Sequence, residues 1–125
     1  MTELTKTSTV ALGSIRWLMV MNLGLFAAQP ISAGFLLSGY DYASTIHTVV
    51  AVGLQLGAFI QGIAAVALWL RRRASGKVAA LSVGLFAMVL LEVWAGRHRE
   101  YWLHVPVGVG LVVWVRGRMS SLHAS

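Results

Sequence analysis

Three long runs that are almost free of charge dominate the chain, at 16–39, 43–70 and 78–96. Glu92 is the only acidic residue in them. A helix needs roughly 20 apolar residues to cross the hydrocarbon core of a bilayer, and these runs reach that length. They lack the alternation of barrel strands. The pattern therefore predicts three membrane-spanning helices.

A fourth span is predicted over 101–119, although its uncharged stretch, 102–115, has only fourteen residues. It reaches spanning length if Arg116 and Arg118 extend their charged groups to the interface. The polar segments between the runs are short, and short connections make consecutive helices antiparallel neighbours. We therefore expect an all-α fold, with one membrane domain over 1–125 that forms an up-down-up-down four-helix bundle.

The basic residues indicate an orientation. Eight of the ten lysines and arginines lie at the N-terminus, between the second and third runs, or at the C-terminus. Only Arg97 and Arg99 lie in the loop before the fourth span. Because basic loops remain cytoplasmic, both termini are expected in the cytoplasm. Asp41 and the loop that contains His98 then face the outside.

Composition narrows the function classes. Hydrophobic residues make up 58% of the chain and charged residues 11%, about half the charged share of a soluble domain. This excludes most soluble enzymes. The net charge of +6 is not gathered on one face, so nucleic acid is not an expected partner. The absence of cysteine excludes disulfide exchange and thiolate metal sites, so redox chemistry would need a borrowed cofactor.

Ionisable residues inside the predicted spans are the candidate chemistry. His47, Glu92 and His104 each lie about one helical turn inside the same, outer surface. Such groups are expensive in lipid, and scattered tolerated residues would not be expected to share a depth. The shared layer indicates a site built from three helices.

The two histidines suggest haem. In an up-down bundle, spans two and four are diagonal, so His47 and His104 could bind both axial positions of one haem iron. The positions beneath them on the same helix faces are mostly small or aliphatic: Ala51, Leu54, Ala58, Gly108 and Leu111. One haem b is expected, since the inner half of the bundle has no histidine.

Other polar residues could support such a cofactor. Arg97 and Arg99 lie just above the layer, where they could pair with haem propionates. Gln61, on nearly the same face as His47, and Glu92 could be hydrogen-bond partners of the site. Gly108 would leave room for the porphyrin.

His98 has two readings. It is either a solvated interfacial side chain or part of a quinone or metal-reductant site, with Asp41, Glu92 and Glu100 as proton acceptors. It could also replace His104 as a ligand if span four begins later.

Two further features concern packing. Asn22 and Gln29 lie on one face of the first span and are expected to hydrogen-bond across to a neighbouring helix. Pro106 suits the first turn of the fourth span, where it would fix the aim of His104.

Three short motifs carry a resemblance: residues 29–39, which begin Gln-Pro-Ile-Ser-Ala-Gly, then Ile46-His47, and then 103–108, Leu-His-Val-Pro-Val-Gly. Over about 16–116 the chain resembles an uncharacterised family of small bacterial four-helix membrane proteins. This resemblance implies the fold and a bacterial cytoplasmic membrane, but no activity. In architecture, the opposed histidines are similar to b-type membrane cytochromes of the cytochrome b561 kind, which usually hold two haems.

These observations predict a b-type haem protein for electron transfer or haem handling, closer to an electron carrier or subunit than to a complete enzyme. A quinone, a redox partner protein or a second copy of the chain are the partners left open, beside the lipid membrane. The alternative is a small transporter or ion-coupled carrier that uses Glu92 and the histidine pair. A third interpretation is a structural partner subunit whose polar residues only fix helix packing.

Overall fold

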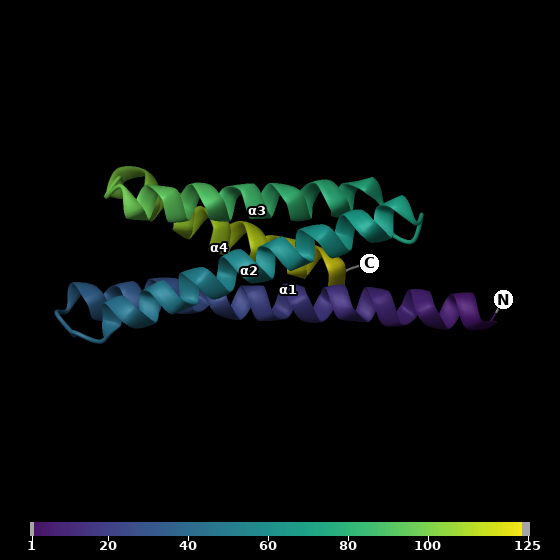
Figure 1. Cartoon of the computed structure of the whole chain (residues 1–125), viewed down its shortest axis with the longest axis horizontal. Coiled ribbons are helices and arrows are strands. Elements are labelled where there is room, and N and C mark those ends of the chain that lie inside the picture. Colours follow the sequence, from purple (N-terminus) through teal and green to yellow (C-terminus); the bar gives the residue numbers. More distant parts are fainter. Residues whose placement is uncertain (1, 124–125) are drawn as a thin grey trace.

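Four helices make up the fold (Figure 1). The computed structural model describes the backbone of residues 2–123 and the side chains of 13–111 and 113. The helices are α1 Thr2–Leu37, α2 Ala43–Leu70, α3 Gly76–Arg97 and α4 Tyr101–His123. The regular secondary structure of the described residues is therefore entirely α-helical, as predicted.

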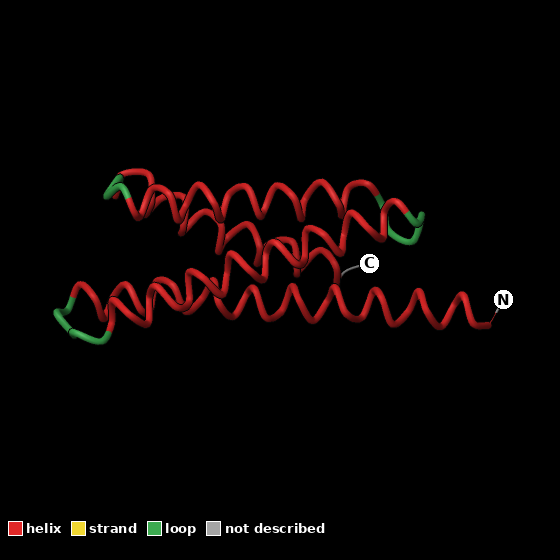
Figure 2. Tube along the Cα trace, viewed as in Figure 1, coloured by secondary structure: helices red, strands yellow, loops and turns green. Residues whose placement is uncertain are grey.

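Short loops reverse the chain after each of the first three helices (Figure 2). These three helices end in the same way, with one residue in the left-handed region: Gly39 at φ 82°, Arg72 at φ 55° and Arg99 at φ 59°. This conformation lets the amide of that residue and the amide of the next one turn back onto the last carbonyls of the helix, as when Arg73 N–H donates to the Leu68 carbonyl at 2.8 Å. Because helices that end in this way need only a short loop to reverse the chain, successive helices lie next to each other.

Within the described part of the chain, three helical segments are long and apolar enough to cross a membrane: Gly13–Leu37, Ala43–Leu70 and Gly76–Arg97. Large apolar side chains point outward from them, such as Trp17 and Leu56 with 71% and 58% of their surfaces exposed. Water would disfavour such a surface and lipid would cover it, which indicates a helical membrane protein. The predicted runs match these segments within about three residues. The segment predicted over 101–119 lies within α4.

The helices pack in a cycle in which α1 contacts α2, α2 contacts α3, α3 contacts α4, and α4 contacts α1. This order places α2 and α4 across from each other. The centre is filled by side chains from all four helices: Phe26, Leu54, Ala58, Leu85, Val89 and Leu111. Any side chains that meet between α2 and α4 must therefore do so across the middle of the bundle.

A buried polar chain links three of the helices. Asn22 of α1 donates from Nδ2 to Gln61 Oε1 of α2 at 2.8 Å, and Gln61 Nε2 donates to Ser82 Oγ of α3 at 3.4 Å. The expected bond from Asn22 to a neighbouring helix is thus confirmed. Gly57 on α2 makes room for Asn22, because a Cβ at this position would overlap Asn22 Oδ1.

We predict that Gly57→Ala destabilises the protein by about 1–3 kcal/mol, since the new methyl group forces Asn22 out of its place. The measurement is unfolding in mixed micelles with increasing denaturing detergent. Gly53→Ala, one turn earlier on α2, is the matched control, because its Cβ would meet Leu25 methyl groups at ordinary distances of 3.6 and 3.7 Å. Equal losses in the two variants would contradict the role assigned to Gly57.

Candidate functional site

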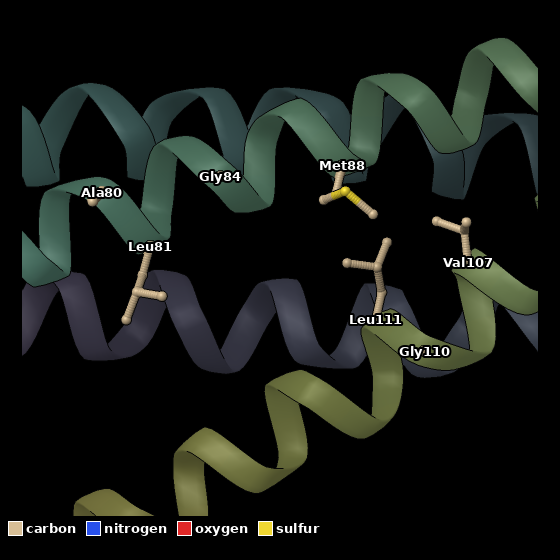
Figure 3. A pocket seen from close by; sticks show the side chains of 7 residues that line it. All are labelled: Ala80, Leu81, Gly84, Met88, Val107, Gly110 and Leu111. Atoms are coloured by element: carbon tan, nitrogen blue, oxygen red, sulfur yellow. The ribbon is translucent and has the colours of Figure 1, made fainter.

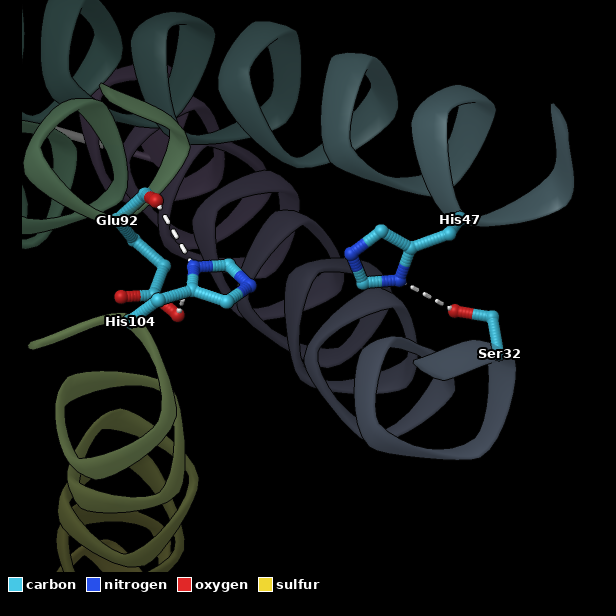
Figure 4. A network of polar contacts seen from close by, with 4 residues as sticks. All are labelled: Ser32, His47, Glu92 and His104. Carbon is cyan, nitrogen blue, oxygen red and sulfur yellow. Dashed lines mark hydrogen bonds and ion pairs between the residues drawn. The ribbon is translucent and has the colours of Figure 1, made fainter. Parts of the chain in front are cut away.

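Four polar side chains, one from each helix, meet at the end of the bundle where α2 begins and α3 ends (Figure 4). We call these residues, Ser32, His47, Glu92 and His104, the histidine layer. The predicted trio of ionisable residues is thus brought together, and Ser32 joins it. Ser32 has 3% of its surface exposed. The histidine and glutamate side chains are partly buried.

The two imidazole rings stand opposite each other across the bundle. Their centroids lie 6.2 Å apart and their planes cross at 79°. Since His47 comes from α2 and His104 from α4, this contact is the meeting across the diagonal that the helix order allows. The rings approach without stacking.

The hydrogen bonds of Ser32 determine the tautomer of His47. Ser32 Oγ donates its only proton to the Gln29 carbonyl at 2.9 Å. It lies 2.9 Å from His47 Nδ1 as well, and a hydroxyl whose proton is already used can only accept there. With the Ser32 proton directed at Gln29, His47 donates from Nδ1 to Ser32 Oγ, and its Nε2 keeps a lone pair.

Glu92 sets the same tautomer on His104. His104 Nδ1 is 3.0 Å from the main-chain carbonyl of Glu92 and 3.1 Å from its Oε1. Both oxygens accept hydrogen bonds, so Nδ1 carries the proton and shares it between them. In the neutral form of this ring, Nε2 of His104 is again left with a lone pair.

The two free nitrogens face each other. In Figure 4, the ring nitrogen of each histidine that has no dashed contact lies on the side turned toward the other ring. Both lone pairs are hydrogen-bond acceptors that point into the same partly buried space. Neither nitrogen can therefore donate a hydrogen bond to the other. This arrangement is suited to an electrophile between them, such as a metal ion or a donated proton.

The spacing agrees with two imidazoles bound to opposite sides of one metal ion. Metal–imidazole bonds are about 2.0 Å long. Ring bonds of about 1.3 Å place each nitrogen about 1.1 Å from its ring centroid. The centroids of two such ligands therefore lie about 6 Å apart, which is the separation of His47 and His104. No backbone movement is needed to reach this distance.

Two glycines hold the layer in place. A Cβ at Gly96 would come within 2.9 Å of His104 Cε1, so the ring lies directly on the backbone of α3. A Cβ at Gly108 would come within 2.7 Å of Glu92 Oε1, so the carboxylate packs against α4. Gly108, predicted to make room for a porphyrin, makes room for Glu92 here.

Gln61 does not belong to this layer. It bonds with Asn22 and Ser82 instead, and it follows His47 by 14 residues, about 21 Å along the helix. The prediction that it assists the histidines is therefore not supported by its position.

The loop residues that were predicted to take part in the site also lie apart from the histidine layer. Asp41, Arg97 and Arg99 are exposed. His98 is exposed, stacks on Trp94 with ring centroids 4.7 Å apart, and has Nδ1 2.9 Å from the Trp94 carbonyl. This favours the interfacial interpretation of His98, and it is His104 that faces His47. Glu100 accepts a hydrogen bond from Trp102 Nε1 at 2.6 Å.

Ser32 was missed by the sequence analysis, where it carried no functional role. A signal was available, because Ser32 lies in an apolar run near its outer end, at about the depth of His47 on the next helix. Serine is common in helices that pack closely in membranes, however, so depth alone does not mark it as a ligand's partner.

A separate apolar groove of about 400 Å³ lies between α3 and α4 (Figure 3). Its lining is apolar: Ala80, Leu81, Gly84, Met88, Val107, Gly110 and Leu111. The groove has no side chain that could carry chemistry or orient a polar ligand. The histidine layer is therefore the candidate site.

Comparisons with protein-family models, with curated proteins and with solved structures found no match to this chain.

We predict that His47 and His104 both populate the Nδ1–H tautomer when neutral, because Ser32 and Glu92 offer acceptors there. Nitrogen NMR of the histidine-labelled protein, without added metal or haem, measures this directly. Ser32→Ala should release only His47 to the Nε2–H form, while Ser32→Thr keeps the tautomer. Nε2–H signals from both buried rings of the unaltered protein would contradict the assignment.

Proposed function

We propose that this chain is a b-type haem-binding membrane protein in which His47 and His104 are the two axial ligands of one haem. The observation that carries the proposal is the pair of imidazoles with facing Nε2 atoms and centroids 6.2 Å apart. His47 and His104 would hold the haem iron through their Nε2 atoms. Haem bound in this way supplies one-electron transfer.

The arrangement of partners behind the ligands supports ligation. Metal-bound histidines almost always donate the proton of the other ring nitrogen to a carboxylate, a carbonyl or water, which fixes the ring. His104 has the Glu92 carbonyl and carboxylate in this position, and His47 has Ser32. The chain's own residues thus orient both rings before any cofactor arrives.

The helix position next to His47 carries a small side chain. Ala51 lies one turn deeper than His47 and has only a methyl group, whereas the room at Gly108 is occupied by the Glu92 carboxylate. The first large core residues, Leu54 and Leu111, follow seven positions after the histidines, about 10 Å along the helix axis. Arg97 and Arg99, in or next to the loop after α3, are proposed partners for the haem propionates.

The proposal includes the membrane topology. The chain would cross the cytoplasmic membrane of a bacterium four times, with α4 as the fourth span and both termini in the cytoplasm. The loops over 38–42 and 98–100 lie at one end of the bundle, and the loop over 71–75 lies at the other (Figure 1). The latter contains three consecutive arginines, which supports a cytoplasmic position for that end.

One haem close to the outer face suits exchange of electrons with an external partner more than transfer across the whole membrane. The protein is therefore proposed to be an electron carrier or an assembly subunit. It would work with a quinone or a redox partner protein, or as a homo-oligomer.

A second candidate is a small ion-coupled transporter. The observation that favours it is Glu92 Oε2, a buried carboxylate oxygen without a hydrogen-bond partner among the described residues, next to the contact of Oε1 with His104 Nδ1. An acid of this kind could exchange a proton with a transported substrate. This candidate would be favoured if the protein does not bind haem and if Glu92→Gln abolishes flux driven by a pH gradient.

We predict that the detergent-purified protein, expressed with ample haem, gives the reduced absorption spectrum of a low-spin, six-coordinate b-type haem. His47→Ala or His104→Ala should reduce haem occupancy at least tenfold or leave a five-coordinate spectrum. His98→Ala is the matched control and should retain the full spectrum, because His98 lies outside the layer. Full six-coordinate haem in either of the first two variants would overturn the ligand assignment.

We also predict the sidedness of two loops. The chain has no cysteine, so single substitutions can be labelled selectively. On intact bacteria, Ser38→Cys should react with a membrane-impermeant thiol reagent. Ala74→Cys, in the loop between α2 and α3, should react only after permeabilisation. The reverse pattern would contradict the proposed orientation.

A further inference from the structure

We infer that an apolar groove between α2 and α3, together with the basic turn at its end, binds one anionic phospholipid. The basic turn is defined as residues 71–77, which contain three consecutive arginines and Lys77. The headgroup phosphate lies against the basic side chains, and one acyl chain lies in the groove. This site is separate from the histidine layer and does not depend on the proposed haem.

The groove is apolar and is lined by both helices. It has a volume of about 370 Å³. Phe59 of α2 and Phe86 of α3 close one end, with their ring centroids 5.4 Å apart. Leu70, the exposed last residue of α2, lies at the other end. The distance from Phe59 to Leu70 along the helix is about 16 Å, close to half of the ~30 Å hydrocarbon core. The groove therefore has the length of one acyl chain in one leaflet.

Positive charge is concentrated where the groove ends. Arg71, Arg72 and Arg73 directly follow Leu70. Their three main-chain amides all donate to carbonyls in the last turn of α2, at distances from 2.8 to 3.1 Å. Hydrogen bonds of this kind fix the backbone that carries the three guanidinium groups. The basic turn therefore holds its charges next to the mouth of the groove.

These cations have no anionic partner within the described part of the protein. Among the described side chains, none of the three arginines or Lys77 lies within ion-pair distance of a carboxylate. Asp41, Glu92 and Glu100 lie toward the opposite end of the bundle (Figure 1). Guanidinium groups bind phosphate oxygens through paired hydrogen bonds. Charge complementarity therefore favours a lipid with a net negative headgroup over a zwitterionic one.

Trp69 places the basic turn at the depth of the headgroups. Its indole packs on the start of α3, because a Cβ at Gly76 would lie 3.1 Å from Trp69 Nε1. The side chain is otherwise exposed, at 47% of its surface. Tryptophan is enriched at the boundary between hydrocarbon and water. With Trp69 at this boundary, the arginines that follow it lie among the headgroups and the groove extends into the hydrocarbon.

A second copy of the chain fits this surface less well than a lipid does. Two copies inserted in the same direction, and related by a twofold axis through their α2–α3 grooves, would have their basic turns at the same level. Like charges at that level repel each other. An anionic lipid brings the opposite charge to the same place.

The test is native mass spectrometry of the detergent-purified protein after incubation with equal amounts of phosphatidylglycerol and phosphatidylcholine with identical acyl chains. The protein should retain one phosphatidylglycerol per chain, with a preference of about tenfold or more, because each basic residue near an anionic headgroup favours binding severalfold. Equal retention of the two lipids by the unaltered protein would overturn the inference. So would a dimer that retains no lipid.

The charges are tested by substitution. Arg71→Gln, Arg72→Gln and Arg73→Gln in combination should lower the preference for phosphatidylglycerol about tenfold, whereas the three corresponding Arg→Lys changes should retain most of it. Arg16→Gln, which removes an exposed arginine of α1, is the control and should keep the preference. A preference that survives the loss of all three arginines would overturn the role of the basic turn.

The groove is tested without a change in charge. Ala67→Phe places a large side chain among the lining residues and should reduce lipid retention about fivefold, because the acyl chain loses apolar contact. Ala80→Phe, in the groove between α3 and α4, is the matched control and should retain the lipid. Glycerol phosphate, which has no acyl chains, should not displace the lipid. Full retention in Ala67→Phe, or displacement by glycerol phosphate, would overturn the lipid site.

Discussion

Polar side chains in lipid must find partners inside the protein, and this constraint determines how the bundle is organised. Two groups of polar residues lie within the apolar helices, and each joins several helices. Asn22, Gln61 and Ser82 satisfy one another at one level. In the histidine layer the satisfaction is incomplete, because Nδ1 of each ring has an acceptor while the two Nε2 atoms face each other. The satisfied group therefore serves helix packing, whereas the incompletely satisfied histidine layer is a candidate binding site.

The helix ends and one glycine position the residues of the histidine layer. The tight helix ends at Gly39, Arg72 and Arg99 keep successive helices adjacent, which places α2 and α4 on the diagonal. Gly96 allows His104 to lie on the backbone of α3. The rings then lie at the separation expected of two imidazoles bound to one metal ion.

Much of the fold and the centre of the site could be predicted from the sequence, because a helix converts residue number into depth at about 1.5 Å per residue. His47, Glu92 and His104 were grouped on that basis, and the structure brings them together. The start of α1 at Thr2 could not be found in this way, since apolar runs mark the bilayer and a helix can continue beyond it.

The points that residue spacing misplaced or left open have physical causes as well. Gln61 shares a helix face with His47 but differs from it in depth, so facing alone did not establish contact. Which of His98 and His104 lies opposite His47 depends on where α4 begins, and with the turn at Arg99 it is His104. The contribution of Ser32 depends on the direction of one hydroxyl proton, which residue spacing does not encode.

The most direct test of the central claim is electron paramagnetic resonance of the ferric, haem-loaded protein. Imidazole planes that cross at 79° leave two iron d orbitals nearly equal in energy. The account therefore predicts a strongly anisotropic low-spin signal, distinct from that of parallel imidazoles. A high-spin signal would mean that His47 and His104 do not both bind the iron, and would contradict the account.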